Sequence, residues 1–353
     1  MNREQNAPKE KVVLSVQHLK TYFYVDKKTT VKAVDDISFN VYRGKVTALV
    51  GQSGSGKSVA SRAIFNLIDP PGKTIGGEVI LNGRDILKLT KYQQKKVYGK
   101  EISLIFQEPM SALNPVIKVK NQMMEAIRLH RKIPKKAALE ECREALRRVN
   151  LKNADQILNQ YPFELSGGMC QRVMIAMSMV ANPDVLIADE PTTALDLTIQ
   201  AVVLEELKTL RDRGMAIMLI THDLGVVANV ADRIAVMYAG DIVELGTCDE
   251  VFYDPRHPYT WALLSSLPQL GTKDEPLYSI QGTPPNLFHE VKGDAFAPRN
   301  PKALKIDFVE RPPFFEVTPT HYARTWLMDP RAPKVEPPEH VRILREKGVN
   351  RVG

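Results

Sequence analysis

The chain has 353 residues, of which 44% are hydrophobic and 25% charged, with a formal net charge of +7. These values are ordinary for a soluble globular protein of about two domains, and no apolar run approaches the roughly 18 residues that span a bilayer. Residues 1–11 are polar and lack the apolar core of a secretory signal. Cys142, Cys170 and Cys248 stand far apart without a CxxC pair, which argues against a disulfide framework or zinc ribbon and favours a reducing cytoplasm.

The first predicted elements are strands, which lead to a glycine-rich loop. Residues 12–50 alternate short apolar runs with turn signals and end in an apolar strand, residues 46–50. The sequence GQSGSGKS follows at residues 51–58, and a helix is predicted over residues 59–65. Glycines let successive backbone N–H groups turn inward, and the helix N-terminus adds partial positive charge.

This loop predicts a nucleoside triphosphate site. Lys57 can reach the β- and γ-phosphates, and the Ser58 hydroxyl can ligate Mg²⁺. The residues expected to bind nucleotide here are Gly51, Ser53, Gly54, Ser55, Gly56, Lys57, Ser58 and Val59.

A basic, helical stretch comes next. After a β-like run at residues 77–83, residues 119–160 show helical periodicity. Residues 118–152 carry 11 Lys or Arg against four Glu, so this stretch alone accounts for a charge of +7. A solvated helical face is the usual reason for such a charge run; apposition to an anionic membrane surface or to nucleic acid is the alternative. No aromatic residue is interleaved with the charges, which weakens a single-strand-binding interpretation.

A second anion cradle is predicted at residues 165–169, LSGGM, which open a helix expected over residues 171–180. A serine and two glycines at a helix N-terminus repeat the anion-binding arrangement of the first loop. One γ-phosphate does not need two cradles from one chain. Two molecules facing head to tail do, because each lends its second cradle to the nucleotide of the other.

An acidic pair marks the end of a buried strand. The apolar run at residues 185–188 predicts a parallel strand that ends in Asp189 and Glu190. Asp189 can hold Mg²⁺ through water, and Glu190 is placed to orient and polarise the attacking water. Taken alone, such an acidic pair is about as often a solvated strand end without function as it is part of a catalytic site. Strand and helix then alternate to about residue 245, with His222 after a predicted strand at residues 216–220.

The C-terminal part is rich in proline, with 15 of the 24 prolines from Pro255 onward. This composition predicts loops, but a disordered tail would be poorer in aromatic residues, so we expect a small accessory domain. The aromatic residues are Phe288, Phe296, Phe308, Phe314, Phe315, Tyr322 and Trp326. The last 20 or so residues are expected to form an exposed, partly helical end.

Together these motifs resemble those of ABC-type ATPases. LSGGM is similar to the LSGGQ signature, with Met169 in the glutamine position. The resemblance implies an α/β fold: a P-loop NTPase core with a RecA-like mixed sheet, a β-rich N-terminal subdomain and a helical subdomain at about residues 108–170. The ATPase domain is expected over residues 1–254 and the C-terminal accessory domain over residues 255–353.

The resemblance also implies roles for single residues. Gln107 matches the Q-loop glutamine, which senses Mg²⁺ and water and joins the core to the helical subdomain. Asp196, in Ala194-Leu195-Asp196, resembles the D-loop aspartate that touches the partner subunit. His222 matches the switch histidine that bonds the γ-phosphate and steadies Glu190.

Three sets of residues follow from these matches. The implied catalytic residues are Lys57, Gln107, Glu190 and His222, and the implied metal ligands are Ser58, Gln107 and Asp189, the last through water. The other implied nucleotide-binding residues are Phe23, Ser166, Gly167, Gly168, Asp189 and Asp196. Phe23 is the best match to the aromatic residue that stacks on adenine, and Tyr22 and Tyr24 are close rivals.

Three further stretches resemble the ATPase subunits of bacterial oligopeptide/dipeptide importers. They are FQEPMSALNP at residues 106–115, MYAG at residues 237–240 and HPYT at residues 257–260. Val59, Met169 and TTALD at residues 192–196 look like the D-type subunit, whose usual partner is the F-type ATPase. The resemblance covers nearly the whole chain.

The resemblance implies a membrane-bound assembly. It has two permease subunits, two ATPases and an extracellular peptide-binding lipoprotein, with the ATPases at the cytoplasmic face of the cell membrane. ATP and Mg²⁺ are the implied cofactors, and nucleic acid is not an expected partner.

The tail departs from one family pattern. Many members carry four tail cysteines that hold an iron–sulfur cluster, and the matching positions here are Asp294, Asn300, Asp307 and Thr325. Such clusters need thiolates, so no cluster is expected, as in cluster-less members such as those of Gram-positive bacteria. Asp294 and Asp307 could bind a hard cation, although solvated carboxylates are the default. Packing of the tail aromatics is expected to hold the domain together.

The leading hypothesis is an ATP-hydrolysing motor of an oligopeptide importer. The alternatives are a soluble ABC ATPase that acts on nucleic acid through residues 118–152, and an importer ATPase for another cargo such as nickel or a glycopeptide. The ATPase never touches the cargo, so the motifs do not choose between cargoes. A regulatory subunit with a dead site is a third possibility. The presence of Gln107, Asp189, Glu190 and His222 argues against it.

Overall fold

The computed structural model of the chain describes residues 10–26, 28–108, 112–193, 195–267 and 280–352. These residues form two compact units, each assembled from distant segments. The first takes its described residues from 1–15, 40–46 and 80–218, and the second from 16–39, 47–79 and 219–353. Within the described ranges, no helix is both long and apolar enough to cross a bilayer.

The first unit combines a pair of buried strands with a group of helices. Strands β6 (Ile102–Ile105) and β7 (Val185–Asp189) run parallel, and every residue of both is buried. Continuous apolar runs of this kind fit strands covered on both faces. The helices are α2 (Lys91–Val97), α4 (Val119–Arg128), α5 (Lys135–Arg148), α6 (Ala154–Asn159), α7 (Gly167–Met179) and α8 (Leu197–Asp212). A short 3₁₀ turn, η1 (Pro162–Glu164), precedes α7.

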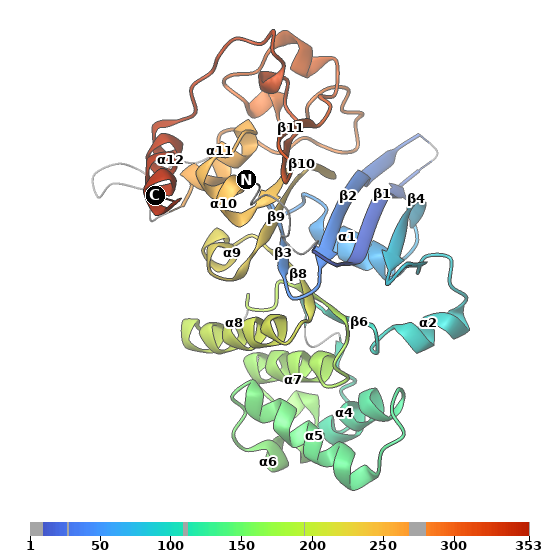
Figure 1. The fold of residues 1–353 in the computed structure, drawn as a ribbon. Coiled ribbons are helices and arrows are strands. Elements are labelled where there is room, and N and C mark those ends of the chain that lie inside the picture. Colours follow the sequence, from blue (N-terminus) through green and yellow to red (C-terminus); the bar gives the residue numbers. More distant parts are fainter. Residues whose placement is uncertain (1–9, 27, 109–111, 194, 268–279, 353) are drawn as a thin grey trace, which may run out of the picture. The chain divides into compact units, whose positions relative to one another are not determined.

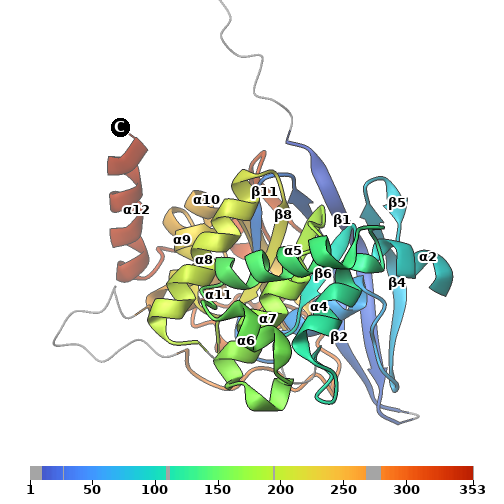
Figure 2. The ribbon, with the colours of Figure 1, turned by 90° about the horizontal axis from the view of Figure 1, so that it is seen from below.

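Helices α4 and α5 pack against α7, and α6 packs against α4 and α5, in the green part of Figures 1 and 2. Helix α5 shows why they gather: its buried side chains recur at helical spacing on one face. These are Ala138, Cys142, Ala145 and Leu146.

The opposite faces of these helices carry the basic stretch. Arg131 pairs with Glu141 at 2.7 Å, and Arg143 pairs with Glu140 at 2.9 Å and with Asp155 at 2.8 Å. Exposed pairs of this kind stabilise a fold by only about 0–1 kcal/mol each. The arrangement is that of a solvated, ion-paired helical face.

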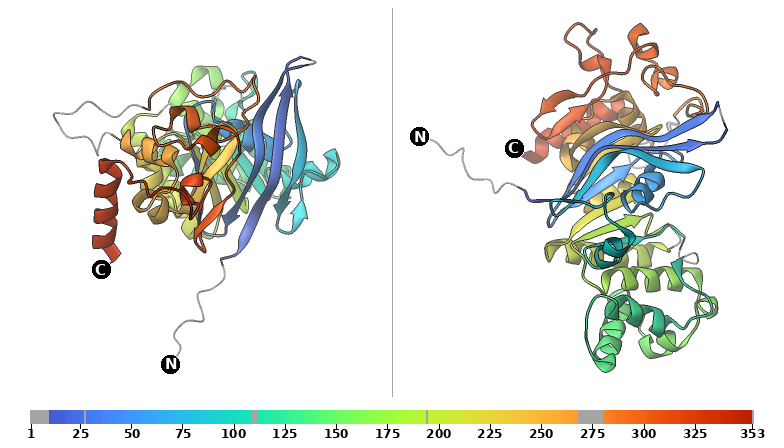
Figure 3. Two further views of the ribbon diagram at one scale, coloured as in Figure 1. Left: turned by 90° about the horizontal axis from the view of Figure 1, so that it is seen from above. Right: turned by 90° about the vertical axis from the view of Figure 1, so that its right-hand side faces the viewer.

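The second unit holds most of three long strands and most of a larger sheet. Strands β1 (Val12–Tyr24), β2 (Thr30–Tyr42) and β4 (Gly72–Leu81) lie side by side in the order β2-β1-β4, as the blue strands of Figure 3 show. The ends of these strands, and the short β5 (Arg84–Asp85) paired with β4, belong to the first unit.

The larger sheet runs in the order β11-β12-β10-β9-β3 in this unit. These strands are β3 (Val46–Val50), β9 (Arg233–Tyr238), β10 (Asp241–Thr247), β11 (Phe315–Thr318) and β12 (His321–Ala323). β3 and β9 are parallel, whereas β10 is antiparallel to both of its neighbours. Strand β8 (Ala216–Thr221) follows β3 in the order, and its last three residues fall in this unit.

The helices of the second unit are α1 (Lys57–Ile64), α9 (Leu224–Val230), α10 (Cys248–Tyr253), α11 (Pro258–Ser265) and α12 (Glu339–Val352). Three 3₁₀ turns, η3 (Ala297–Arg299), η4 (Lys305–Phe308) and η5 (Trp326–Met328), punctuate the tail. An aromatic cluster of Tyr238, Tyr259 and Phe296 lies in the core, with ring centroids 4.4–5.4 Å apart.

Two expectations about the tail need correction. Its aromatics pack together only in part: Phe296 and Trp326 are buried and the Phe315 ring lies 6.2 Å from that of Trp326, but Phe288 and Phe308 are 53% and 54% exposed. Phe296 packs on Tyr259, near the start of the tail, and on Tyr238 of β9, outside the tail. The helical end is confirmed as α12, but Val341 and Leu344 are buried because α12 packs against α10 and α11.

Candidate functional site

The glycine-rich loop joins β3 to α1, as the sequence predicts. At Gly51, a Cβ atom would lie 2.2 Å from the carbonyl oxygen of Met237, and at Gly56 it would lie 2.2 Å from that of Ala33. Gly56 also has φ of 103°, a left-handed value that favours glycine. The two glycines therefore let the loop lie directly against neighbouring backbone.

Lys57 begins α1 and turns back into the loop. Its ammonium group donates to the carbonyl oxygens of Gly51 at 2.8 Å and Gln52 at 2.9 Å, and the side chain is buried. The backbone N–H of Gly240, in the MYAG turn, donates to the Ser55 carbonyl at 2.9 Å. Ser53 and Gly54 are exposed at the tip of the loop, while Ser58 and Val59 are half-buried in the first turn of α1. The loop thus gathers its predicted residues around one helix N-terminus.

His222 follows β8 in the second unit and is exposed. The next residue, Asp223, caps α9 by accepting from the N–H groups of Gly225 at 2.8 Å and Val226 at 3.2 Å. This cap fixes the chain direction directly after His222.

The three candidate adenine-stacking residues have different surroundings. The Tyr22 hydroxyl donates to Asp35 at 2.5 Å, which commits that side chain to a contact within the unit. The ring of Phe23 lies against Gly72, where an added Cβ would come within 2.6 Å of it. Tyr24 is 44% exposed at the end of β1.

In the first unit, Gln107, Asp189 and Glu190 meet at one sheet edge. The parallel register pairs Ile105 of β6 with Ala188 of β7. Gln107 follows the first strand by two residues, and Glu190 stands at the same distance beyond the pair in β7. Carboxyl ends of parallel strands share an edge, so an amide and two carboxylates are collected there. Asp189 is buried, whereas Gln107 is exposed.

Glu190 is held in a strained conformation, with φ of 46°. Its Oε2 accepts a hydrogen bond of 2.7 Å from the Thr193 hydroxyl. Six of the eight described non-glycine residues with positive φ are Asn, Asp or His, which tolerate it; Glu190 and Ala239 are the others. Sequence reasoning missed Thr193, although its place in the TTALD motif was a signal.

The second cradle is the N-terminus of α7. Ser166 caps the helix by accepting from the N–H of Met169 at 3.3 Å, so the helix begins at Gly167, four residues before the predicted start. The prediction started too late because the cap serine lies in the motif itself. Ser166 and Gly167 are exposed and Gly168 is half-buried, and an added Cβ on Gly167 would meet nothing within 4 Å.

Gln171 ties this helix to the acidic edge and was not predicted. It is fully buried, and its Nε2 donates to the carbonyl of Pro191, next to Glu190. Asp196 caps α8 by accepting from the N–H of Ile199 at 2.9 Å and is exposed. Pro109, Met110, Ser111 and Ala194, which belong to the quoted motifs, lie outside the described residues.

The four tail positions that match the cluster cysteines are all buried: Asp294, Asn300, Asp307 and Thr325. Each caps a local turn, as when Asp294 Oδ1 accepts the N–H of Phe296 at 2.9 Å. His257 Nε2 lies 3.8 Å from Asp294 Oδ2. Burial raises the pKa of Asp294 to about 7 and lowers that of His257 to about 3. No group of three His, Cys, Asp or Glu placed to hold a metal ion occurs in the described parts of the chain.

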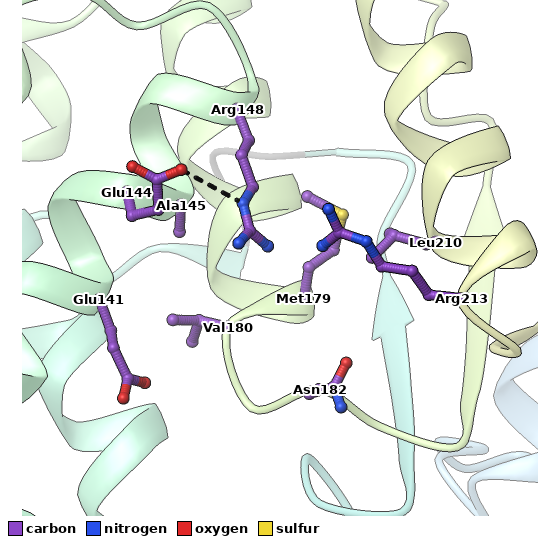
Figure 4. A pocket seen from close by; sticks show the side chains of 9 residues that line it. All are labelled: Glu141, Glu144, Ala145, Arg148, Met179, Val180, Asn182, Leu210 and Arg213. Atoms are coloured by element: carbon purple, nitrogen blue, oxygen red, sulfur yellow. Dashed lines mark ion pairs between the residues drawn. The ribbon is translucent and has the colours of Figure 1, made fainter.

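A separate cavity of about 280 Å³ lies in the first unit between α5, α7 and α8 (Figure 4). Arg148 and Arg213 reach into it, and Arg148 pairs with Glu144 at 3.7 Å. Met179 and Leu210 supply apolar lining. None of the predicted site residues lines this cavity.

Comparison with known proteins identifies the class. Residues 34–193 match the ABC transporter family, and residues 243–306 match the C-terminal region of the oligopeptide/dipeptide transporter family. The fold resembles a bacterial ABC transporter cassette, MJ0796, solved as a dimer, with TM-score 0.61 and 25% identity over 67% of this chain and 98% of that one. It also resembles cbiO1 of Clostridium perfringens, with TM-score 0.57 and 28% identity over 69% and 92% of the chains. The fold is that of an ABC ATPase, as predicted.

Close relatives narrow the family. OppD of Bacillus subtilis, an oligopeptide transport ATP-binding protein, is 54% identical over 91% of this chain and 90% of its own length. DppD of Lactococcus lactis, a dipeptide transport ATP-binding protein, is 47% identical over 94% of this chain and 95% of its own length. AmiE of Streptococcus pneumoniae, an oligopeptide transport ATP-binding protein, is 45% identical over 100% of this chain and 98% of its own length. The chain therefore belongs to the ATP-binding subunits of the oligopeptide/dipeptide ABC transporters, and is an ATPase.

Proposed function

We propose that this chain is the D-type motor subunit of an ABC importer for oligopeptides. The observation that carries the mechanism is the presence of two anion cradles in one chain, the loop at α1 and the exposed N-terminus of α7. The second cradle, with Ser166 and Gly167 open to solvent, is available to the nucleotide of a partner subunit.

The first step is closure of an ATPase dimer. ATP bridges Lys57 and Ser58 of one subunit and Ser166 and Gly168 of the other, so the closed state binds ATP more tightly than the open state. Such differential affinity is what allows ATP to do mechanical work. Closure moves the helical subdomain, about residues 108–170, against a permease loop.

Hydrolysis then reopens the dimer. Glu190 accepts a proton from the attacking water, His222 bonds the γ-phosphate and steadies Glu190, and Gln107 reports the state of the site to the helical subdomain. The oxygens of Ser58, Gln107 and Asp189 are hard donors that suit Mg²⁺. Bound there, Mg²⁺ would neutralise charge on the phosphate oxygens.

The assembly proposed has a second, F-type ATPase, two permease subunits and an extracellular peptide-binding lipoprotein, with this chain at the cytoplasmic face of the membrane. The names of the relatives OppD, DppD and AmiE support a peptide cargo. The ATPase domain is proposed over residues 1–254 and the accessory domain over residues 255–353.

The test is the ATPase activity of the complete complex in liposomes, with and without peptide-loaded binding protein. We expect peptide to stimulate turnover and Glu190→Gln to abolish the stimulation while ATP still binds. If nickel but not peptide stimulates the complex, the cargo is nickel and the peptide assignment is wrong. If DNA or RNA stimulates the isolated chain, the importer hypothesis is wrong and the chain is a nucleic-acid-dependent ATPase.

A further inference from the structure

Arg299, in the tail, binds the phosphate loop through a fork of hydrogen bonds. Its Nη1 donates to the Gln52 side-chain oxygen at 3.0 Å and to the Tyr238 hydroxyl at 3.2 Å. Its Nε and Nη2 donate to the carbonyls of Gln281 at 2.9 Å and Ile280 at 3.1 Å. One planar guanidinium therefore joins the loop, β9 and the tail, which a lysine cannot reproduce.

The tail also binds the backbone of the same loop residue. The N–H of Gln52 donates to the Tyr259 hydroxyl at 2.8 Å. The carbonyl of Gly51, in the same peptide group, accepts from the Lys57 ammonium at 2.8 Å. One peptide plane is thus held on one edge by the lysine that the loop uses for phosphate and on the other by a tail tyrosine.

A third contact lies beside the loop, whose tip stays exposed at Ser53 and Gly54. Pro284, Pro285 and Leu287 line a hollow of only about 20 Å³ together with loop residues Gln52 to Ser55. A space of this size holds about one water molecule. The tail therefore lies directly beside the loop.

We propose that Tyr259 and Arg299 are positioning residues for nucleotide binding, through which the C-terminal accessory region sets the affinity of the phosphate loop for ATP. The inference rests on the proposed role of this loop. Without the Tyr259 hydroxyl, the Gly51–Gln52 peptide can rotate and carry with it the carbonyl that holds Lys57. ATP binding must then order the loop itself, which weakens affinity.

Simple packing of the tail would not need these contacts. The rings of Tyr238, Tyr259 and Phe296 already bury the tail against β9. The two polar contacts instead converge on Gln52, at its side chain and its backbone.

The experiment measures ATP affinity, KM, kcat and thermal stability for the full chain and for its complex. The test variants are Tyr259→Phe and Arg299→Lys. The matched controls lie on the same helix α11: Thr260→Val removes a buried hydroxyl that has no hydrogen-bond partner in the described residues, and Trp261→Phe removes one donor, to Pro255, away from the loop.

We expect each test variant to bind ATP roughly three- to tenfold more weakly, as the loss of one hydrogen bond predicts, with KM raised more than kcat is lowered. Both controls should keep wild-type ATP affinity. Trp261→Phe should lower thermal stability, whereas Thr260→Val should not, because it removes an unpaired buried hydroxyl. Because coupling is reciprocal, ATP should also slow amide hydrogen exchange in residues 280–299 of the wild type and less so in Tyr259→Phe.

Wild-type affinity in both test variants would overturn the inference. So would a loss of affinity in all four variants that simply follows their loss of thermal stability. Lys57→Ala separates this outcome from failure of the proposed function: if Lys57→Ala binds ATP normally, the loop is not the nucleotide site at all.

Discussion

Glu190 adopts a left-handed backbone conformation directly after β7, where its carboxylate accepts from Thr193. Strain of this kind costs about 1–3 kcal/mol and is kept where the surrounding structure needs a side chain in a fixed place. The acidic edge is therefore less stable than it would be with glycine at this position.

This strain gives a test that separates stability from catalysis. Glu190→Gly should be roughly 1 kcal/mol more stable than Glu190→Gln, because glycine adopts the same φ without a Cβ clash. Both variants should lose ATP turnover by about 10²–10⁴-fold while binding ATP, since each lacks the general base. Urea unfolding and single-turnover hydrolysis measure the two effects. Equal stability of the two variants would contradict the strain, and fast turnover would contradict the role of Glu190.

Asp294 predicts a pH dependence of stability. Its pKa is raised by burial to about 7 from an ordinary 3.8, so the folded chain holds a proton that the unfolded chain has released. The contribution of this group is therefore present below about pH 4 and is lost as pH rises towards 7. His257, with its pKa lowered to about 3, changes stability with pH in the opposite direction. The contribution of Asp294 is therefore measured as the difference in stability between Asp294→Asn and wild type at each pH.

The stability of Asp294→Asn relative to wild type should therefore increase as the pH rises. The amide oxygen can still accept from Phe296 and carries no charge to bury. We expect its melting temperature to exceed that of wild type by a few degrees at pH 8 and the difference to shrink towards pH 4. Asp329→Asn is the control, because that carboxylate is paired with Arg331, which lowers its pKa, so it stays charged across this pH range. A difference that is constant across pH would contradict the buried proton.

At the scale of elements, helix α7 is the connection between the second cradle and the acidic edge. Its N-terminus presents Ser166 to solvent, and one turn later Gln171 donates to the carbonyl of Pro191 beside Glu190. A single helix therefore links the proposed second cradle with Glu190, the proposed general base.

Gln171→Leu should break this connection. The Pro191 carbonyl would lose its donor in a buried place, which costs about 1–3 kcal/mol of stability. Turnover in the assembled complex should fall by more than ATP affinity, because the position of Glu190 is changed and the phosphate loop is not. Ser178→Ala, on the same helix, is the control, since its hydroxyl bonds to Leu104 and Met174 away from Glu190. A loss of affinity equal to the loss of turnover would contradict this assignment.

At the scale of the whole molecule, we propose that a second ATPase docks on the exposed surface near Asp196. Leu197 is 83% exposed at the first position of α8, next to Asp196. An exposed large apolar residue beside polar neighbours is a common feature of interaction sites.

Leu197→Glu should prevent ATP-dependent association with the second ATPase while leaving the fold intact. A carboxylate at the first position of a helix interacts favourably with the helix dipole, so stability should not fall. Val309→Glu, at a tail residue that is 70% exposed, is the matched control. Each variant is combined with Glu190→Gln, and its association with the second ATPase in the presence of ATP is measured by sedimentation. Unchanged association of Leu197→Glu would place the interface elsewhere.

The sequence alone predicted the local elements that carry the candidate site. Lys57 and Ser58 follow a strand and a glycine-rich loop, and Asp189 and Glu190 end an apolar run, so neighbouring residues carry all the information needed. The family resemblance and the main strands and helices could be predicted for the same reason. The start of α7 was placed too late because the cap residue and the motif coincide.

Only the tertiary structure decided which distant residues support that chemistry. Tyr259 lies 207 residues from Gln52, and Arg299 lies 247 residues from it, yet both bind it. No periodicity or composition links such positions, because hydrogen bonds between distant segments depend on how strands and turns pack. For the same reason the sequence could not tell that Phe296 is buried and Phe308 exposed, or that Val341 belongs to the core. Motifs fix chemistry locally, whereas burial and partners are properties of the folded chain.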